Sequence, residues 1–139
     1  MPAGNEFFTA PHLDHGPDCI AVIDANLMWR YANHAWVPVV GFGPEELVGK
    51  PAGVIDHPIE TGGSATHLQE LHARPGATER FRLCVQHRDG TARWLDVAAV
   101  NCLSDPEVAG FVITARDVTS QTLAEGQLRR DEGKYRALV

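Results

Sequence analysis

Histidines are the first residues of this chain to consider for metal chemistry, and they are scattered. The only closely spaced pair is His12-x-x-His15, near the start of the chain, and no cysteine accompanies it. Two ligands fall short of the four that a structural zinc site requires. We therefore predict no metal site.

The three cysteines, Cys19, Cys84 and Cys102, are widely spaced and form no Cys-x-x-Cys pair. An odd number of cysteines without such a pair favours reduced thiols in a reducing compartment. Because free cysteine packs as a small apolar residue, we expect all three to be structural.

Carboxylates and hydroxyls give no catalytic pattern. The chain contains neither a Gly-x-Ser-x-Gly motif nor a phosphate-binding loop. Glu45 and Glu46 follow Pro44 and are expected to begin a helix, and Asp89 precedes Gly90 in an expected turn. We therefore predict that this domain is not an enzyme.

Composition narrows the class of protein. The chain has 139 residues, of which 44% are hydrophobic and 22% charged, as is typical of one soluble globular domain with a tail. A formal charge of −6 without a basic stripe argues against nucleic acid as a partner. No segment approaches the roughly 20 apolar residues that cross a bilayer, and no signal peptide is evident. We expect a cytoplasmic domain without direct membrane contact.

Apolar alternation predicts five strands, at residues 19–23, 27–32, 80–86, 93–103 and 108–115. Asn33 is expected to begin a short helix that Pro38 limits, and residues 44–48 a second one. Ser64 is expected to cap a helix over residues 64–74. Strands at both ends with helices between them favour an α+β fold with an antiparallel sheet.

The order and spacing of several short motifs resemble those of a PAS (sensory box) domain with its C-terminal PAC segment, across residues 14–119. The motifs are Ile23-Asp24-Ala25, residues 41–50, His57-Pro58, residues 89–97 and Arg116-Asp117-Val118-Thr119. The resemblance implies a five-stranded antiparallel sheet of order 2-1-5-4-3, with short helices over one face and a C-terminal exit helix. It also implies a lead-in or short cap at residues 1–13, a sensor domain at 14–119, and a helical linker at 120–139.

The resemblance places a ligand pocket between the inner face of the sheet and the interior helix. The residues that map to this pocket are all apolar, so a ligand would be largely apolar. They are Ala21, Ile23, Val54, Leu68, Leu71, Phe81, Leu83, Val85, Leu95, Val97, Ala99 and Ile113. The alternative is that these side chains simply fill the core.

Two cofactors of similar proteins can be compared with the sequence. Light-sensing flavin relatives carry Asn-Cys-Arg-Phe-Leu-Gln after the position of Lys50, where this chain has residues 51–56 without a cysteine, and Ala115 replaces their glutamine. Oxygen-sensing relatives bind haem through a histidine of the interior helix, for which His67 is the candidate and His72 lies on another face. We expect neither flavin nor haem, and the cofactor stays unknown.

Asp117, Val118 and Thr119 form the expected signal junction between the last strand and the exit helix. If residues 119–139 are helical, they extend about 30 Å. Leu128, Tyr135 and Leu138 recur at heptad-like spacing, which predicts a homodimer through this helix. A solvated helical linker is the alternative.

These observations predict a sensory domain that binds a small apolar ligand or a partner domain and signals through its exit helix. By resemblance, the chain is the N-terminal sensor piece of a multidomain signalling protein, whose output module is most often a histidine kinase in a phosphorelay. A ligand-free dimerisation or interaction module is the alternative, and a haem-based gas sensor comes third.

Overall fold

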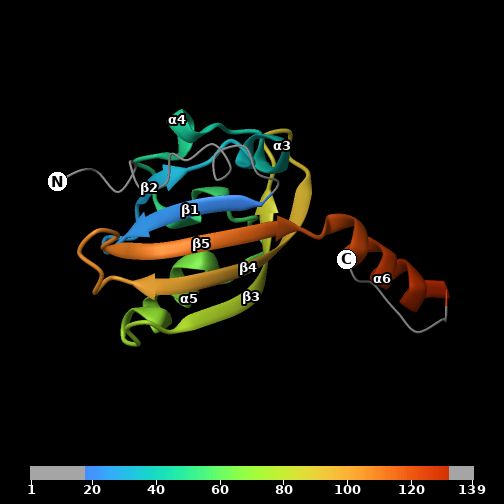
Figure 1. Ribbon diagram of the computed structural model, residues 1–139. Helices are drawn as coiled ribbons and strands as arrows, with labels where there is room; N and C mark the ends of the chain where they lie inside the picture. The colour runs from blue at the N-terminus through green and yellow to red at the C-terminus, as the bar shows by residue number, and fades with distance from the viewer. Residues whose placement is uncertain (1–17, 132–139) are drawn as a thin grey trace.

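A five-stranded antiparallel sheet forms the frame of the domain, and its strand order is β2-β1-β5-β4-β3 (Figure 1). The structure, a computed structural model, describes residues 18–131, with side chains as far as Glu125. The strands are β1 (Cys19–Asp24), β2 (Trp29–Ala32), β3 (Thr78–Gln86), β4 (Ala92–Cys102) and β5 (Gly110–Asp117). The predicted strands and their order are confirmed. Because β5 lies between β1 and β4, the last strand within residues 18–131 occupies the centre of the sheet.

The β3–β4 hairpin explains how alternation positions the core. Leu83 pairs with Leu95 and Phe81 with Val97, and these side chains share one face of the sheet. Gly90 has φ of 92°, a left-handed conformation that favours glycine at the turn between the strands.

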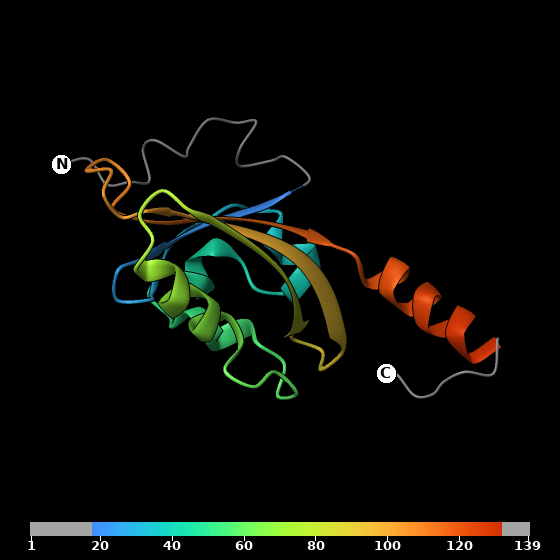
Figure 2. The ribbon, with the colours of Figure 1, turned by 90° about the horizontal axis from the view of Figure 1, so that it is seen from below.

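The helices of the domain cover one face of the sheet, as the green and teal ribbons of Figure 2 show. In chain order they are α3 (Trp36–Val40), α4 (Pro44–Leu47), the 3₁₀ turn η1 (Ala52–Ile55) and α5 (Gly63–His72). A further helix, α6 (Thr119–Asp131), follows β5 and projects away from the sheet. No helix among residues 18–131 is long and apolar enough to cross a membrane.

Helix α4 begins as its sequence predicts. Pro44 stands in its first turn with Glu45 and Glu46 behind it, where carboxylates face the positive end of the helix dipole. The Gly43 N–H donates to Glu46 Oε1 at 3.1 Å, and this bond is the main reason that the pKa of Glu46 is lowered.

Asn33 does not cap α3, contrary to our expectation. Its buried side chain accepts a hydrogen bond from Ile20 N at 3.0 Å and donates one to Asp18 O at 2.9 Å. The helix begins at Trp36 and continues past Pro38, because a proline in the first turn forfeits no intrahelical bond.

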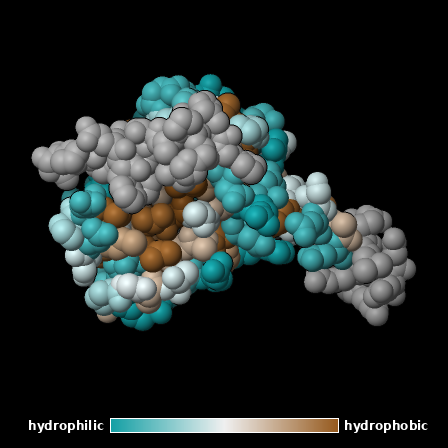
Figure 3. All heavy atoms as spheres, viewed as in Figure 1, coloured by the Kyte–Doolittle hydropathy of each residue, from teal (hydrophilic) through white to brown (hydrophobic). Residues whose placement is uncertain are grey.

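The opposite face of the sheet carries its own apolar cluster. Val22 points to this face because its neighbours Ala21 and Ile23 point to the helices. It packs with Tyr31 and Val108, beside Ile20, Cys102 and Val112. Figure 3, in which this face is toward the viewer, shows brown surface here among teal polar residues.

The candidate ligand cavity and the strand-to-helix junction

A small cavity of about 40 Å³ lies between the inner face of the sheet and helix α5 with turn η1. Eight of the residues that we predicted for a pocket line it: Ala21, Ile23, Leu68, Phe81, Leu83, Leu95, Val97 and Ile113. Leu71, Val85 and Ala99 are buried in the same core but do not line the cavity. The sheet and α5 therefore supply most of its wall.

The placement of Val54 corrects the predicted set. Its side chain is 47% exposed, and its neighbour Ile55 is buried and lines the cavity instead. The tight 3₁₀ geometry of η1 places Ala52 and Ile55, three residues apart, on the same inward side.

Two tryptophans that the sequence analysis did not assign to the pocket also line the cavity. Trp29 of β2 and Trp36 of α3 meet edge to face, with ring centroids 5.0 Å apart. The Trp29 indole N–H donates to Ala52 O at 3.4 Å, and that of Trp36 donates to Ile20 O at 3.0 Å. Because backbone carbonyls satisfy both N–H groups, the rings contribute apolar surface. Alternation along residues 27–32 could have indicated Trp29.

Among the described residues, Ser64 is the one polar side chain in the cavity wall. It is not the cap of α5 that we expected. Instead, its backbone N–H and its hydroxyl donate to the Asp56 carboxylate at 3.0 and 3.2 Å. Burial raises the pKa of Asp56, and nearby Glu60 adds to the effect, although the bonds from Ser64 oppose it. Asp56 thus supplies the acceptor at the start of this helix.

His67 lies beside the cavity wall but does not line the cavity. Its ring stacks on Phe81 at 3.7 Å between centroids, and its Nδ1 lies 2.6 Å from Glu79 Oε2. Arg74 donates to the other oxygen of Glu79 at 3.1 Å. These contacts fasten α5 to β3. His72 is exposed on another side of the helix, as expected.

The cavity is small compared with typical ligand pockets. Pockets for drug-sized ligands measure about 300–1,000 Å³, whereas this cavity measures about 40 Å³. At the position of the flavin-reactive cysteine the chain forms η1, and Ala115 is a buried core residue. The cavity in this structure is therefore several times smaller than a pocket of that class.

The thiols are poor nucleophiles. Burial, together with the charges of Asp117 and Asp18, raises the pKa of Cys19 to about 12. Burial also raises the pKa of Cys84 and of Cys102. All three cysteines are free thiols, and protonated thiols react slowly.

Metal-binding clusters are likewise missing from the part of the chain that the structure describes, where no group of three His, Cys, Asp or Glu side chains converges. His12, His15, the lead-in at residues 1–13, and Tyr135 and Leu138 of the heptad pattern lie outside the described residues. For Leu128 only the backbone is described.

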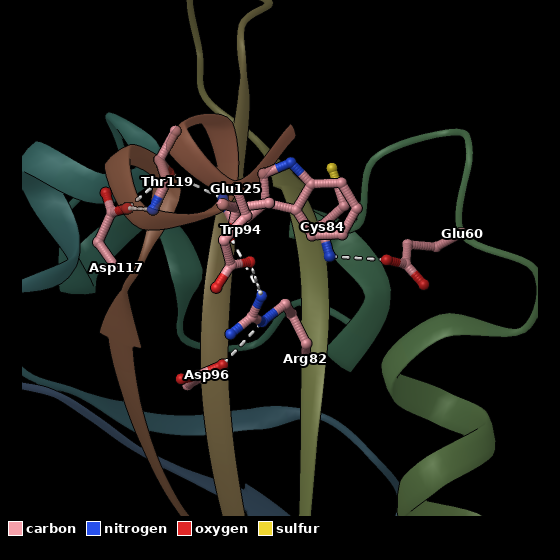
Figure 4. A network of polar contacts seen from close by, with 9 residues as sticks. Glu60, Arg82, Cys84, Trp94, Asp96, Asp117, Thr119 and Glu125 are labelled. Atoms are coloured by element: carbon pink, nitrogen blue, oxygen red, sulfur yellow. Dashed lines mark hydrogen bonds and ion pairs between the residues drawn. The ribbon is translucent and has the colours of Figure 1, made fainter. Parts of the chain in front are cut away.

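The junction between β5 and α6 is fixed by hydrogen bonds to β4 (Figure 4). The Val118 N–H donates to Trp94 O at 2.7 Å, and the Trp94 N–H donates to Thr119 Oγ1 at 2.9 Å. Asp117 Oδ1 accepts bonds from the Thr119 N–H at 2.8 Å and from its hydroxyl at 2.5 Å. The three predicted junction residues therefore form one connected turn that ties the base of α6 to β4.

Comparison with known proteins agrees with this architecture. The family model described as PAS fold matches residues 13–123. A PAS domain from Colwellia psychrerythraea superposes with a TM-score of 0.68 at 20% identity, covering 78% of this chain and 92% of that one.

Two further structures come from histidine kinases. A domain of the sensory box sensor histidine kinase/response regulator from Geobacter sulfurreducens has a TM-score of 0.63 at 24% identity, covering 76% of this chain and 88% of that one. The LOV domain of a blue-light activated histidine kinase from Erythrobacter litoralis has a TM-score of 0.62 at 17% identity, covering 74% and 97%. Since the family model spans most of the chain and the sheet has the order that the resemblance implied, the chain belongs to the PAS family.

Proposed function

We propose that this domain is a non-catalytic sensor that holds a small apolar molecule in its cavity and passes the occupancy of the cavity through α6 to an output module. One observation carries the proposal. Ile113 of β5 lines the cavity, and the same strand ends four residues later at Asp117, immediately before the junction with α6. A molecule in the cavity would therefore touch the strand that leads into the exit helix.

The size of the cavity limits the ligand. A single water needs about 10–15 Å³ of such space, so about 40 Å³ admits a gas or a molecule of a few heavy atoms. A larger ligand would have to displace α5 and break its contacts with Glu79 and Asp56. Within residues 18–131 the wall has a single polar side chain, Ser64, which supports a binding role and not a catalytic one.

The same small volume favours a second candidate, a ligand-free module that dimerises or holds a partner domain. In that case the side chains around the cavity are only core packing, and signalling depends on association through α6. This candidate predicts concentration-dependent association in sedimentation experiments and no uptake of apolar molecules.

We further infer that the output module is a histidine kinase and that the domain acts in the cytoplasm as a homodimer. Two similar structures belong to histidine kinases, which supports the first inference. The net charge of −6 makes nucleic acid an unsuitable direct partner.

Xenon is a suitable test molecule, because dry apolar cavities bind it. We expect xenon to shift the methyl NMR signals of Leu83, Leu95 and Ile113 in the wild-type protein. Ala52→Leu should abolish these shifts by filling the cavity from η1, whereas Val54→Leu, which enlarges an exposed side chain of the same turn, should preserve them. Wild-type protein without any shift at these methyls would refute the ligand-binding proposal.

A further inference from the structure

Arg82, on the outer face of β3, is the side chain that joins the edge of the sheet to the exit helix (Figure 4). Its Nε donates to Asp96 Oδ1 of β4 at 3.0 Å. One terminal nitrogen donates to Thr122 Oγ1 at 3.3 Å and lies 3.6 Å from Glu125 Oε1. Arg82 thus contacts α6 beyond its first residue, at a point separate from the bonds between Trp94 and the base of the helix.

The neighbours of Arg82 in β3 belong to the cavity. Successive side chains of a strand point to opposite faces, so Phe81 and Leu83 point inward and line the cavity while Arg82 points outward. The segment of backbone that forms part of the cavity wall is therefore also the segment that holds α6. A displacement of Phe81 or Leu83 would move Arg82 directly.

The position of β3 leaves it with fewer neighbouring strands than β5 has. It is an edge strand with β4 on one side only, whereas β5 is held between β1 and β4. On its free side, β3 is held at Cys84, whose N–H donates to Glu60 Oε2 at 2.6 Å and whose carbonyl accepts from His57 N at 3.0 Å. Phe81 and Arg82 lie between this attachment and Glu79, whose carboxylate contacts His67 and Arg74.

The contacts of Arg82 are suited to a switch because they are weak. The side chains of Arg82, Asp96 and Glu125 are 41%, 54% and 56% exposed, and exposed ion pairs contribute little individually. A small movement of β3 can therefore release α6 from Arg82 while Trp94 still holds its base.

We propose that Arg82 is a positioning residue through which the cavity sets the direction of α6. A ligand acts on Phe81 and Leu83, and β3 transmits the movement to Thr122 and Glu125 through the guanidinium group. This inference rests on the proposed function and adds a route through β3 to the covalent route through β5.

The test compares Arg82→Gln with Arg80→Gln in the full chain. Arg80 lies two residues earlier on the same face of β3 and is exposed, and among the described residues it makes no hydrogen bond or ion pair with α6. Without xenon, we expect Arg82→Gln to raise the amide exchange rates of Thr122 and Glu125 about two- to fivefold, as the loss of an exposed ion pair predicts. Arg80→Gln should leave the rates unchanged, and Glu125→Gln should reproduce part of the effect from the helix side.

The decisive measurement repeats the exchange experiment with xenon. In wild-type protein and in Arg80→Gln, xenon should raise exchange at Thr122 and Glu125, and in Arg82→Gln most of this response should be lost. If xenon shifts the cavity methyls and Arg82→Gln responds like the wild type, the inference is overturned and the proposed function stands. If xenon shifts no cavity methyl, both are overturned.

Discussion

Replacement of Leu68 by alanine tests whether the cavity is a site that can be enlarged and filled. Leu68 is 2% exposed, and it lines the cavity from α5. Leu68→Ala removes three carbons, each worth about 0.8 kcal/mol of burial, or about 2.4 kcal/mol in all. If the added void equals the present one of about 40 Å³, a cavity cost of about 24 cal/mol per Å³ adds about 1 kcal/mol. We therefore expect the free energy of unfolding to fall by about 3.4 kcal/mol.

Urea unfolding with and without benzene measures both consequences. Benzene should restore stability to Leu68→Ala, by about 1.4 kcal/mol at ten times its Kd. Leu71→Ala is the matched control, because Leu71 is fully buried on the same helix but does not line the cavity. It should lose comparable stability and regain less. Leu123→Ala, at a position that is 61% exposed, should change stability by no more than about 0.5 kcal/mol.

Two results would refute this reasoning. A loss of less than about 1 kcal/mol in Leu68→Ala would mean that the wall collapses around the missing side chain. A benzene rescue no larger in Leu68→Ala than in Leu71→Ala would mean that the present cavity is not the preferred site for an apolar molecule.

Three further predictions concern the junction and the start of α5. Thr119→Val should lower the free energy of unfolding in urea by about 1 kcal/mol, because the partly buried Trp94 N–H loses its acceptor. Thr119→Ser keeps the hydroxyl and should keep the stability of the wild type, so equal stability of the two variants would contradict this role. Gly63 and Gly76 both have left-handed φ, of 54° and 78°, but only at Gly63 would a Cβ meet Asp56 Oδ2, at 2.1 Å. Gly76→Ala should cost about 1 kcal/mol and Gly63→Ala clearly more, so similar losses would argue against a steric role for Asp56. Burial raises the native pKa of Asp56 above its ordinary value of 3.8, so its contribution to stability is present below the unfolded pKa and is lost as the pH rises through the native pKa. On acidification from about pH 7 to about pH 4, the urea midpoint of Asp56→Asn should therefore rise less, or fall more, than that of the wild type. An identical pH dependence of the two midpoints would refute the raised pKa of Asp56.

The part of the cavity wall made by the sheet could be predicted because a strand has a strict period. Phe81 and Leu83 alternate with Arg80 and Arg82, and in the pairing strand Asp96 separates Leu95 from Val97. A period of two fixes which face each side chain takes. Once the helices are known to cover one face, the inward residues follow from the sequence alone.

How far the cavity extends along that face could not be predicted. Val85 and Ala99 lie on the inward face, as expected, yet they contact core side chains and not the cavity. The extent of the void depends on where α5 and η1 cross the sheet. That crossing is set by loop lengths and by contacts such as Asp56 with Ser64, which carry no periodic signal.

Which residues of the short helical turns face the cavity was harder still to predict. Val54 is exposed and the next residue, Ile55, is buried. Over a turn of four residues no repeat is long enough to choose between them. The inward position of Trp36 could not be predicted for the same reason, because helix α3 has only five residues. Its expected cap, Asn33, instead accepts a hydrogen bond from Ile20 of β1.

One contact of Arg82 follows from the strand pattern, and the other depends on tertiary geometry. The Asp89-Gly90 turn fixes the register of the hairpin, and in that register Arg82 stands opposite Asp96, so this pair was within reach of the sequence. Thr122 lies 40 residues away, and its meeting with Arg82 depends on the direction in which α6 leaves the sheet. No hydrophobic repeat encodes that direction, because the hydrogen bonds and ion pairs that hold α6 are polar and few. Under the proposed function, the same properties would allow a small event in the cavity to change the direction of α6, since a helix held by a large apolar interface would not respond.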